Sequence, residues 1–228
     1  MNFYDLPTLV GEQYMLTSAL RETRDTVLYR ATQKDLRREV IVERLRHSAA
    51  EHPRRVSLFL DSAKAQARFC GEHLSTVLEV LESNGSWLVV KEGPPGEPLD
   101  MMLADSKKLS ACDLCNLMII LCRLCLRLDT EQVASTHFHL EDVYYCNHHF
   151  RLSNPARAGT RSAGSSREFL ADAARELKPL LDTASPLAAR LLSLMQRVSL
   201  HRDTSPMSPA LYMAEFTVLY TIMRQQGA

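Results

Sequence analysis

The sequence lacks three features that would place it in a specialised class. It has no excess of either charge, because 27 Lys and Arg residues balance 27 Asp and Glu residues. Nucleic-acid binders and binders of acidic membranes usually carry a basic excess, so neither function is favoured. Its longest apolar stretches fall far short of the roughly 18 residues that span a bilayer. The opening residues, MNFYDLPTLVGEQY, have no basic segment and no apolar run, so we expect no signal peptide.

Cysteine is too scarce and too scattered for a disulfide framework. The six cysteines lie mostly inside apolar segments, which is typical of reduced thiols in a cytoplasmic protein. Two pairs, Cys112-x-x-Cys115 and Cys122-x-x-Cys125, have the internal spacing of a four-thiolate zinc site. A continuous helical pattern joins these pairs, however, whereas a zinc knuckle needs turns and a longer loop. We therefore expect these four residues to be small side chains on a buried helix face.

The overall composition and the pattern of apolar residues predict a globular α+β protein. Of the 228 residues, 46% are hydrophobic and 24% are charged, which is enough apolar material for a sizeable core in one domain or two packed lobes. Residues 1–12 are expected to be a lead-in without structure of their own. Five later runs rich in β-favouring residues predict strands at Gln13–Ala19, Thr26–Thr32, Glu39–Leu45, Thr76–Leu81 and Trp87–Val90.

Helical patterns dominate the remainder of the chain. Pro53 begins a helix whose apolar residues recur at helical spacing. Ser110 is the predicted N-cap of a long helix, and a small hairpin is expected at Val143–Cys146 and Phe150–Ser153. Further helices are predicted at Leu99–Ala104, Leu109–Leu128, Arg167–Asp182, Leu187–Leu200 and Ala210–Arg224.

This order of elements resembles that of bacterial serine/threonine protein kinases. The segment GEQYMLTSALRETRDTVLYRA is similar to their first two strands and the turn between them, and EVIVERL to their third strand. FLDSAKAQARF resembles the helix of their small lobe, and WLVVKEGPPGEPL the strand that runs into the hinge. The resemblance implies an α+β, two-lobed fold, with a small lobe at residues 1–93 and a trimmed helical large lobe at 94–228. The small lobe would hold a five-stranded antiparallel sheet and one helix. An unrelated α+β domain with the same element order is the competing interpretation.

The chain departs from the kinase pattern wherever the small lobe would bind nucleotide. Kinases use a glycine-rich turn and a lysine to hold the phosphates, but residues 18–27 contain no glycine and Glu43 takes the place of the lysine. Ser62 takes the place of the glutamate that pairs with this lysine. Lys91 and Glu92 would line the pocket next to the hinge. We expect Lys91 and Glu43 to form an ion pair that fills the former nucleotide site; the alternative is that both extend into solvent.

The large lobe departs from the pattern at the residues that would perform catalysis. His137-Phe138-His139 takes the place of the kinase His-Arg-Asp sequence, so His139 stands where the catalytic base would be. Tyr144 takes the place of the metal-binding asparagine. Asn154 takes that of the aspartate in Asp-Phe-Gly, and a neutral amide is a poor magnesium ligand beside a carboxylate.

These departures favour a catalytically inactive pseudokinase that acts as a scaffold or regulator by binding another protein. The resemblance then implies no catalytic residue and no cofactor. One alternative is an atypical serine/threonine kinase that still binds ATP and magnesium and uses His139 and Asn154. A third interpretation is a small metal-binding regulator. Its ligands would come from His137, His139, Cys146, His148 and His149.

Overall fold

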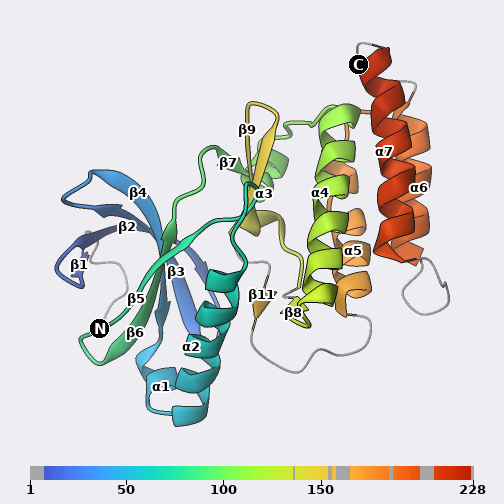
Figure 1. The fold of residues 1–228 in the computed structure, drawn as a ribbon. Coiled ribbons are helices and arrows are strands. Elements are labelled where there is room, and N and C mark those ends of the chain that lie inside the picture. The colour runs from blue at the N-terminus through green and yellow to red at the C-terminus, as the bar shows by residue number, and fades with distance from the viewer. Residues whose placement is uncertain are drawn as a thin grey trace. The chain divides into compact units, whose positions relative to one another are not determined.

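The computed structural model describes residues 8–135, 137–153, 156–157, 165–184, 187–200 and 208–226. The chain divides into two compact units (Figure 1). The first consists of Met1–Pro94 with Arg157–Gly159, and the second of Pro95–Ala156 with Thr160–Ala228.

An antiparallel sheet forms most of the first unit, and its strands follow the order β1-β2-β3-β4-β6-β5. The strands are β1 (Thr8–Val10), β2 (Tyr14–Glu22), β3 (Thr26–Gln33), β4 (Arg38–Leu45), β5 (Val77–Ser83) and β6 (Ser86–Glu92). The prediction of five strands was wrong, since the sheet has six. The additional strand is β1, which lies in the segment predicted to be a lead-in. Gly11, at φ 54°, reverses the chain so that β1 pairs with the start of β2.

The sheet is curled, so that its two ends come into contact. β2 contains two register shifts, which increase the local bend of a strand. The Tyr14 hydroxyl donates a hydrogen bond to Glu79 of β5 at 2.7 Å, and the backbone N–H of Gly11 donates to the Ser83 hydroxyl at 3.2 Å. Buried side chains from β1, β2, β3, β4 and β6, among them Leu16, Val42 and Val90, form a cluster against one face. The partly buried Leu78 and Leu81 of β5 pack against this cluster.

Two helices follow β4 in the first unit, α1 (His47–Ala50) and α2 (Pro53–Arg68). The expectation of a single helix is therefore corrected. The two are separate because Pro53 occupies the first turn of α2, where its missing N–H and fixed φ are suited to a helix start. Phe59 and Ala63 of α2 pack with Leu45 and Val89 of the sheet, which sets the face of β4 and β6 that α2 covers.

Helices make up most of the second unit. They are α3 (Leu99–Ala104), α4 (Ala111–Thr130), α5 (Ser165–Glu176), α6 (Ala188–Leu200) and α7 (Pro209–Gln225), with the short 3-10 helices η1 (Leu140–Asp142) and η2 (Lys178–Leu180). α4 packs against α5 and α7 and is buried along most of its length. The predicted N-cap is confirmed, because the Ser110 hydroxyl accepts a hydrogen bond from the Asp113 N–H at 3.0 Å.

All six cysteines are free thiols. Cys115, Cys122 and Cys125 of α4 are buried. The Cys115 thiol donates to the Phe216 carbonyl at 3.2 Å, and the Cys125 thiol donates to the Ser166 carbonyl at 3.3 Å. The expectation of buried thiols is therefore confirmed for these three residues, whereas the fourth, Cys112, is only partly buried.

Short strands complete the second unit. β10 (His149–Leu152), β9 (Val143–Cys146) and β7 (Glu97–Pro98) form an antiparallel sheet in that order. Two further short strands are β8 (Ala134–Ser135) and β11 (Ala156–Arg157). The predicted hairpin is confirmed. Its turn consists of Asn147 and His148, whose φ angles of 48° and 68° are those of the two-residue turns that suit hairpins.

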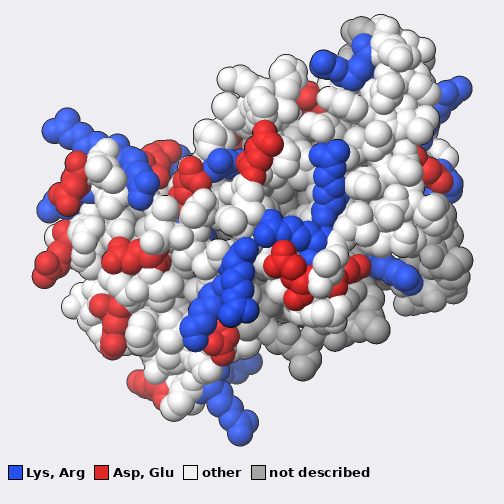
Figure 2. Space-filling model, viewed as in Figure 1, with Lys and Arg blue, Asp and Glu red and all other residues white. Residues whose placement is uncertain are grey.

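Positive and negative side chains are interspersed over the face of the molecule shown in Figure 2. Among the described residues, no helix is both long enough and apolar enough to cross a membrane.

Candidate functional site

The sequence positions that resemble a kinase nucleotide site contain a buried ion pair. Glu43 lies on β4 and Lys91 on β6. Lys91 is opposite Ile41 and Glu43 is opposite Val89, so the two charged residues are diagonal neighbours on one face. The Lys91 Nζ atom lies 2.9 Å from Glu43 Oε2, and the exposed fractions of the side chains are 2% and 16%. The predicted ion pair is confirmed, and the alternative of two solvated side chains was wrong.

The surroundings of Glu43 keep its carboxylate ionised. Burial by itself raises the pKa of Glu43 by penalising the charged form. The charge and hydrogen bond of Lys91 outweigh this penalty, with help from the charge of Arg21 and a hydrogen bond from Thr26, so the net pKa is lowered. The pair therefore places one negative and one positive charge side by side, each neutralised by the other.

The turn between β2 and β3 is closed by hydrogen bonds within itself. The Thr23 N–H donates to the Thr26 carbonyl at 2.9 Å, and the Thr26 N–H donates to the Thr23 hydroxyl at 2.9 Å. Backbone N–H groups that bind phosphate must be directed at the ligand. The N–H groups of Thr23 and Thr26 are used internally.

Two arginines hold this turn in place through its acidic residues. Arg46 forms an ion pair with Glu22 at 2.6 Å, and its Nε atom donates to the Thr23 carbonyl at 3.0 Å. Arg55, from the first turn of α2, forms an ion pair with Asp25 at 2.9 Å. The turn is therefore fixed to the rest of the first unit, and its two carboxylates are matched by arginines.

The other predicted small-lobe positions lie elsewhere on the first unit. The Ser62 hydroxyl donates to the Leu58 carbonyl of its own helix at 2.7 Å. Glu92 follows Lys91 at the end of β6, where its N–H donates to the Thr76 carbonyl at 2.8 Å. Lys91 thus takes its partner from β4 and not from α2.

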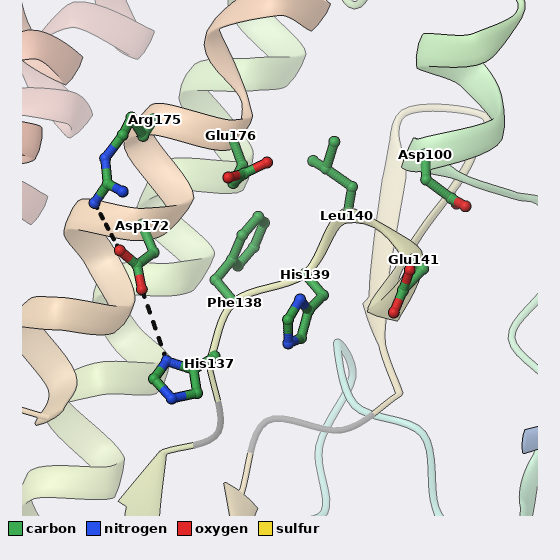
Figure 3. Close-up of a pocket in the computed structure, with 9 residues that line it drawn as sticks. All are labelled: Asp100, His137, Phe138, His139, Leu140, Glu141, Asp172, Arg175 and Glu176. Atoms are coloured by element: carbon green, nitrogen blue, oxygen red, sulfur yellow. Dashed lines mark hydrogen bonds and ion pairs between the residues drawn. The ribbon is translucent and has the colours of Figure 1, made fainter. Parts of the chain in front are cut away.

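The second unit contains an open pocket of about 500 Å³ (Figure 3). Four parts of the chain meet there: α3, the segment after β8, η1 and α5. The lining residues are Asp100 from α3, His137, Phe138 and His139 from the segment after β8, Leu140 and Glu141 from η1, and Asp172, Arg175 and Glu176 from α5.

Phe138 anchors the segment that carries the two histidines. Its ring packs edge-on against Phe169 of α5, with centroids 5.6 Å apart and an interplanar angle of 77°. Phe138 is buried, whereas His137 and His139 on either side of it are exposed. The alternation of polar and apolar side chains in an extended segment therefore orients both histidines away from the core.

The carboxylates of the pocket differ in whether they have an ion-pair or hydrogen-bond partner. Asp172 forms an ion pair with Arg175 at 2.6 Å and lies 3.9 Å from Nδ1 of His137. Glu176 is exposed and forms no hydrogen bond or ion pair with any residue that the structure describes. The Oδ1 atom of Asp100 is shielded from solvent and also has no hydrogen-bond partner within the described ranges. Among the described residues, Asp172 is therefore matched, whereas Glu176 and the Oδ1 atom of Asp100 are not.

Of the predicted large-lobe residues that the structure describes, two lie together. His137 and His139 share the pocket, whereas Tyr144 lies in β9, is 4% exposed and is not among the lining residues. Asn154 lies outside the described residues. Within the described ranges, no three His, Cys, Asp or Glu side chains are grouped so that they could hold a metal ion.

A second polar cluster joins the hairpin to the start of α4. The Tyr145 hydroxyl donates to Asp113 at 3.0 Å, and Nδ1 of His148 lies 2.9 Å from the same carboxylate. Burial, followed by the charge of Asp113 and the hydrogen bond to it, raises the pKa of Tyr145 to about 12. The Ser-x-x-Asp sequence at the start of α4, which is a capping pattern, was the available signal for this cluster.

The acidic pocket residues were missed in the sequence. Asp172 and Glu176 are separated by four positions within a predicted helix, which places them on one face of that helix. This spacing was the only local signal. Asp100 and Glu141 belong to other elements, and no pattern in the sequence connects them with α5.

Comparison with known proteins identifies the fold. No protein-family model matches the sequence, and no curated protein matches it. The structure is similar to the PknI kinase domain of Mycobacterium tuberculosis. A single-mutant form of that domain gives a TM-score of 0.68 at 13% identity, covering 96% of this chain and 99% of that chain. A double-mutant form gives 0.67 at 13% identity, covering 96% and 100%. The chain therefore has a protein-kinase-like fold.

Proposed function

We propose that this chain is a pseudokinase, a cytoplasmic domain with a kinase-like fold that transfers no phosphate and acts by binding another protein. The observation that carries the proposal is the Glu43–Lys91 ion pair, with 2.9 Å between its charged atoms. Glu43 occupies the strand position at which the resemblance to kinases would place the phosphate-binding lysine.

An ionised Glu43 does not fit a nucleotide phosphate. In an active kinase, a lysine at this position contacts the phosphates and must be available to do so. Here the position carries a negative charge that repels phosphate, and the nearby Lys91 is already neutralised by it. A nucleotide would have to break a buried pair before it could use the lysine, which costs several kcal/mol.

The turn that would cover the phosphates supports the same conclusion. Thr23 and Thr26 use their N–H groups within the turn. Glu22 and Asp25 place carboxylates where a kinase has glycine-rich backbone, and arginines from outside the turn hold both of them. The occupied N–H groups of this turn and the Glu43–Lys91 ion pair are therefore two separate obstacles to phosphate binding in the first unit.

The second unit supports the absence of catalysis less directly. His139 stands at the position of the catalytic base, but Tyr144, at the position of a metal-binding asparagine, is buried in β9. Phosphotransfer depends on several groups acting together. A lone histidine supplies general-base catalysis without the metal and phosphate contacts that contribute most of the rate enhancement.

Nucleotide binding is the direct test. The melting temperature of the purified protein is measured with ATP or ADP, with and without magnesium, up to millimolar concentrations. Ligand that binds only the folded state must raise the melting temperature, and we expect no rise. A magnesium-dependent rise would contradict the proposal and favour the atypical kinase.

A phosphotransfer assay then separates binding from chemistry. The protein is incubated with radiolabelled ATP and magnesium beside two variants, His139→Ala and Glu43→Ala. We expect no incorporation of phosphate in any of the three. Incorporation by the wild type that disappears in His139→Ala would show that the domain is a kinase.

A further inference from the structure

We propose that α7 pairs with α7 of a second copy of this chain, so that the protein forms a weak, symmetric dimer. The contact surface is the outer face of α7, formed by Leu211, Ala214, Val218, Thr221 and Ile222. This inference does not rest on the proposed function, because it concerns a helix surface of the second unit and not the ion pair of the first unit.

α7 is apolar on two opposite sides, and the fold buries one of them. The helix packs mainly against α4, and its buried side chains in that contact are Tyr212, Phe216, Leu219 and Met223. On the opposite side, Val218 is 62% exposed, and Leu211, two turns earlier, is 52% exposed. A helix that is apolar all round is usually buried on all sides. The outer face is therefore a surface suited to burial by a partner.

Neither charged residue of α7 lies on the outer face. Glu215 forms an ion pair with Arg197 of α6, and the charge of Arg224 acts on Cys112 of α4. The helical rotation of about 100° per residue places both of them to the sides of Val218. Depletion of charged residues is typical of the centre of a protein interface. A nucleic acid, an anionic membrane or a charged peptide would find no counter-charge on this face.

The polar groups of the outer face are satisfied within the helix. The Thr221 hydroxyl donates to the Thr217 carbonyl at 2.8 Å, and the backbone N–H and carbonyl groups are used by the helix itself. A surface that covered this face would therefore leave no hydrogen bond unmade. The occupant that fits is apolar and shaped to receive a helix, and the same face of another copy has both properties.

A twofold axis through Val218 makes the outer face complementary to itself. In an antiparallel pair, each residue after Val218 in one helix lies opposite the residue equally far before Val218 in the other. Val218 then meets Val218 at the axis, and Ile222 of each copy meets Ala214 of the other. A large side chain faces a small one on both sides of the axis, which allows the two helices to interdigitate. The helix dipoles also oppose each other in this orientation, which is the favourable alignment.

The size of the outer face sets the strength of the dimer. α7 has 17 residues, which gives a helix about 25 Å long. One such pair of helices buries less than the roughly 1,600 Å² of a standard stable interface. We therefore expect a dimer that dissociates in the micromolar to millimolar range, and not an obligate one.

Sedimentation equilibrium of the full chain, from micromolar to millimolar concentration, tests the proposal. Because association follows mass action, we expect the mean mass to rise from that of one chain toward that of two chains. A chain that is blocked at the outer face should keep the mass of one chain over the same range.

A pair of lysine variants localises the contact. Val218→Lys should weaken the dimer about tenfold or more, because it brings two ammonium groups together at the axis. Thr217→Lys is the matched control, since Thr217 is exposed on the same helix and is turned about 100° away from Val218. It should leave the association unchanged. Melting temperatures confirm that both variants are folded.

A compensating substitution tests the antiparallel register. Leu211 of one copy is expected to lie opposite Gln225 of the other, because the two positions are equally far from Val218. Leu211→Lys alone should weaken the dimer, and adding Gln225→Glu to the same chain should restore affinity through an ion pair between the copies. The two positions lie near opposite ends of α7, so they cannot form this ion pair within one chain.

Four results would overturn the proposal. These are a single-chain mass at millimolar concentration, equal weakening by Thr217→Lys, no recovery when Gln225→Glu is added, and binding to neutral phospholipid vesicles that Val218→Lys abolishes, which would assign the face to a lipid surface. The nucleotide test is separate. A magnesium-dependent rise in melting temperature would contradict the pseudokinase proposal and not the dimer, whereas a monomer without such a rise would contradict only the dimer.

Discussion

Glu43 in the first unit and Glu176 in the second are acidic residues in opposite circumstances. Glu43 is largely buried and its charge is matched by Lys91 at 2.9 Å. Glu176 is exposed at a pocket and has no partner that the structure describes. A charge matched inside the fold contributes to folding and is unavailable to ligands. An accessible, unmatched charge contributes little to folding and is available for binding. Substitution should therefore lower the free energy of unfolding strongly at Glu43 and leave it nearly unchanged at Glu176.

Glu43→Gln should have the largest effect. It leaves the Lys91 ammonium, of which 2% is exposed, without its counter-charge. Removing one partner of a buried pair typically costs about 3–5 kcal/mol. Urea denaturation should therefore show a free energy of unfolding lower by about this amount.

Two further variants test whether the loss of stability comes from the broken ion pair or from the substitution itself. Lys91→Met should cost less than Glu43→Gln, because Glu43 is 16% exposed and retains Arg21 and Thr26 nearby. Replacing both residues together, as Glu43→Leu with Lys91→Met, should restore most of the lost stability. A double variant as unstable as Glu43→Gln would show that the pair is not the cause.

Acid should weaken the same pair. The pKa of Glu43 is lowered in the folded protein, so its contribution to stability is present above the ordinary glutamate pKa of about 4.3 and is lost as pH falls through the lower folded value. The wild type should lose stability relative to the Glu43→Leu, Lys91→Met double variant as the solution is acidified below about pH 4.3. Urea denaturation of both proteins across that range measures the effect, and parallel pH profiles would contradict it.

Arg46→Ala should have an intermediate effect on the first unit. It removes the ion pair to Glu22 and the hydrogen bond to the Thr23 carbonyl. Because both contacts are partly exposed, we expect a loss of about 1–2 kcal/mol, measured by thermal and urea denaturation. If freeing this turn also produced nucleotide binding, the turn and not the ion pair would be the barrier to nucleotide.

Tyr145→Phe should lower stability by about 1 kcal/mol at neutral pH, because it removes one hydrogen bond to Asp113. Because the pKa of Tyr145 is raised to about 12, the stabilising effect of this residue should depend on pH in alkaline solution. The contribution of Tyr145 is complete below the ordinary tyrosine pKa of about 10 and is lost as pH rises through about 12. The stability difference between the wild type and the variant should therefore narrow in alkali, and a constant difference would contradict this account.

Glu176→Gln should have the smallest effect on stability. An exposed residue without a partner contributes within about 0.5 kcal/mol in either direction, so its denaturation curve should coincide with that of the wild type. A large loss of stability would indicate that Glu176 is part of the fold, and the contrast with Glu43 would fail.

The two sites also differ in how far they could be predicted. The Glu43–Lys91 pair was expected because the resemblance to kinases places Glu43 at the position of the phosphate-binding lysine and Lys91 next to the hinge, on opposite sides of the former nucleotide site. The pocket carboxylates were not expected, because Asp100, Glu141 and Glu176 belong to three elements without a shared motif. β1 was missed because three residues are too few to show an alternating pattern.

Local patterns in the sequence determined the order of helices and strands, the helix start at Pro53, the Ser110 cap and the hairpin between Val143 and Leu152. These features depend on neighbouring residues, through helical spacing, capping and turn geometry. Only the tertiary structure decided which charges are matched. Strand register placed Lys91 diagonally across from Glu43, and helix packing left Glu176 beside a pocket with no partner among the described residues. Both outcomes depend on contacts between residues far apart in the chain, which no local pattern encodes.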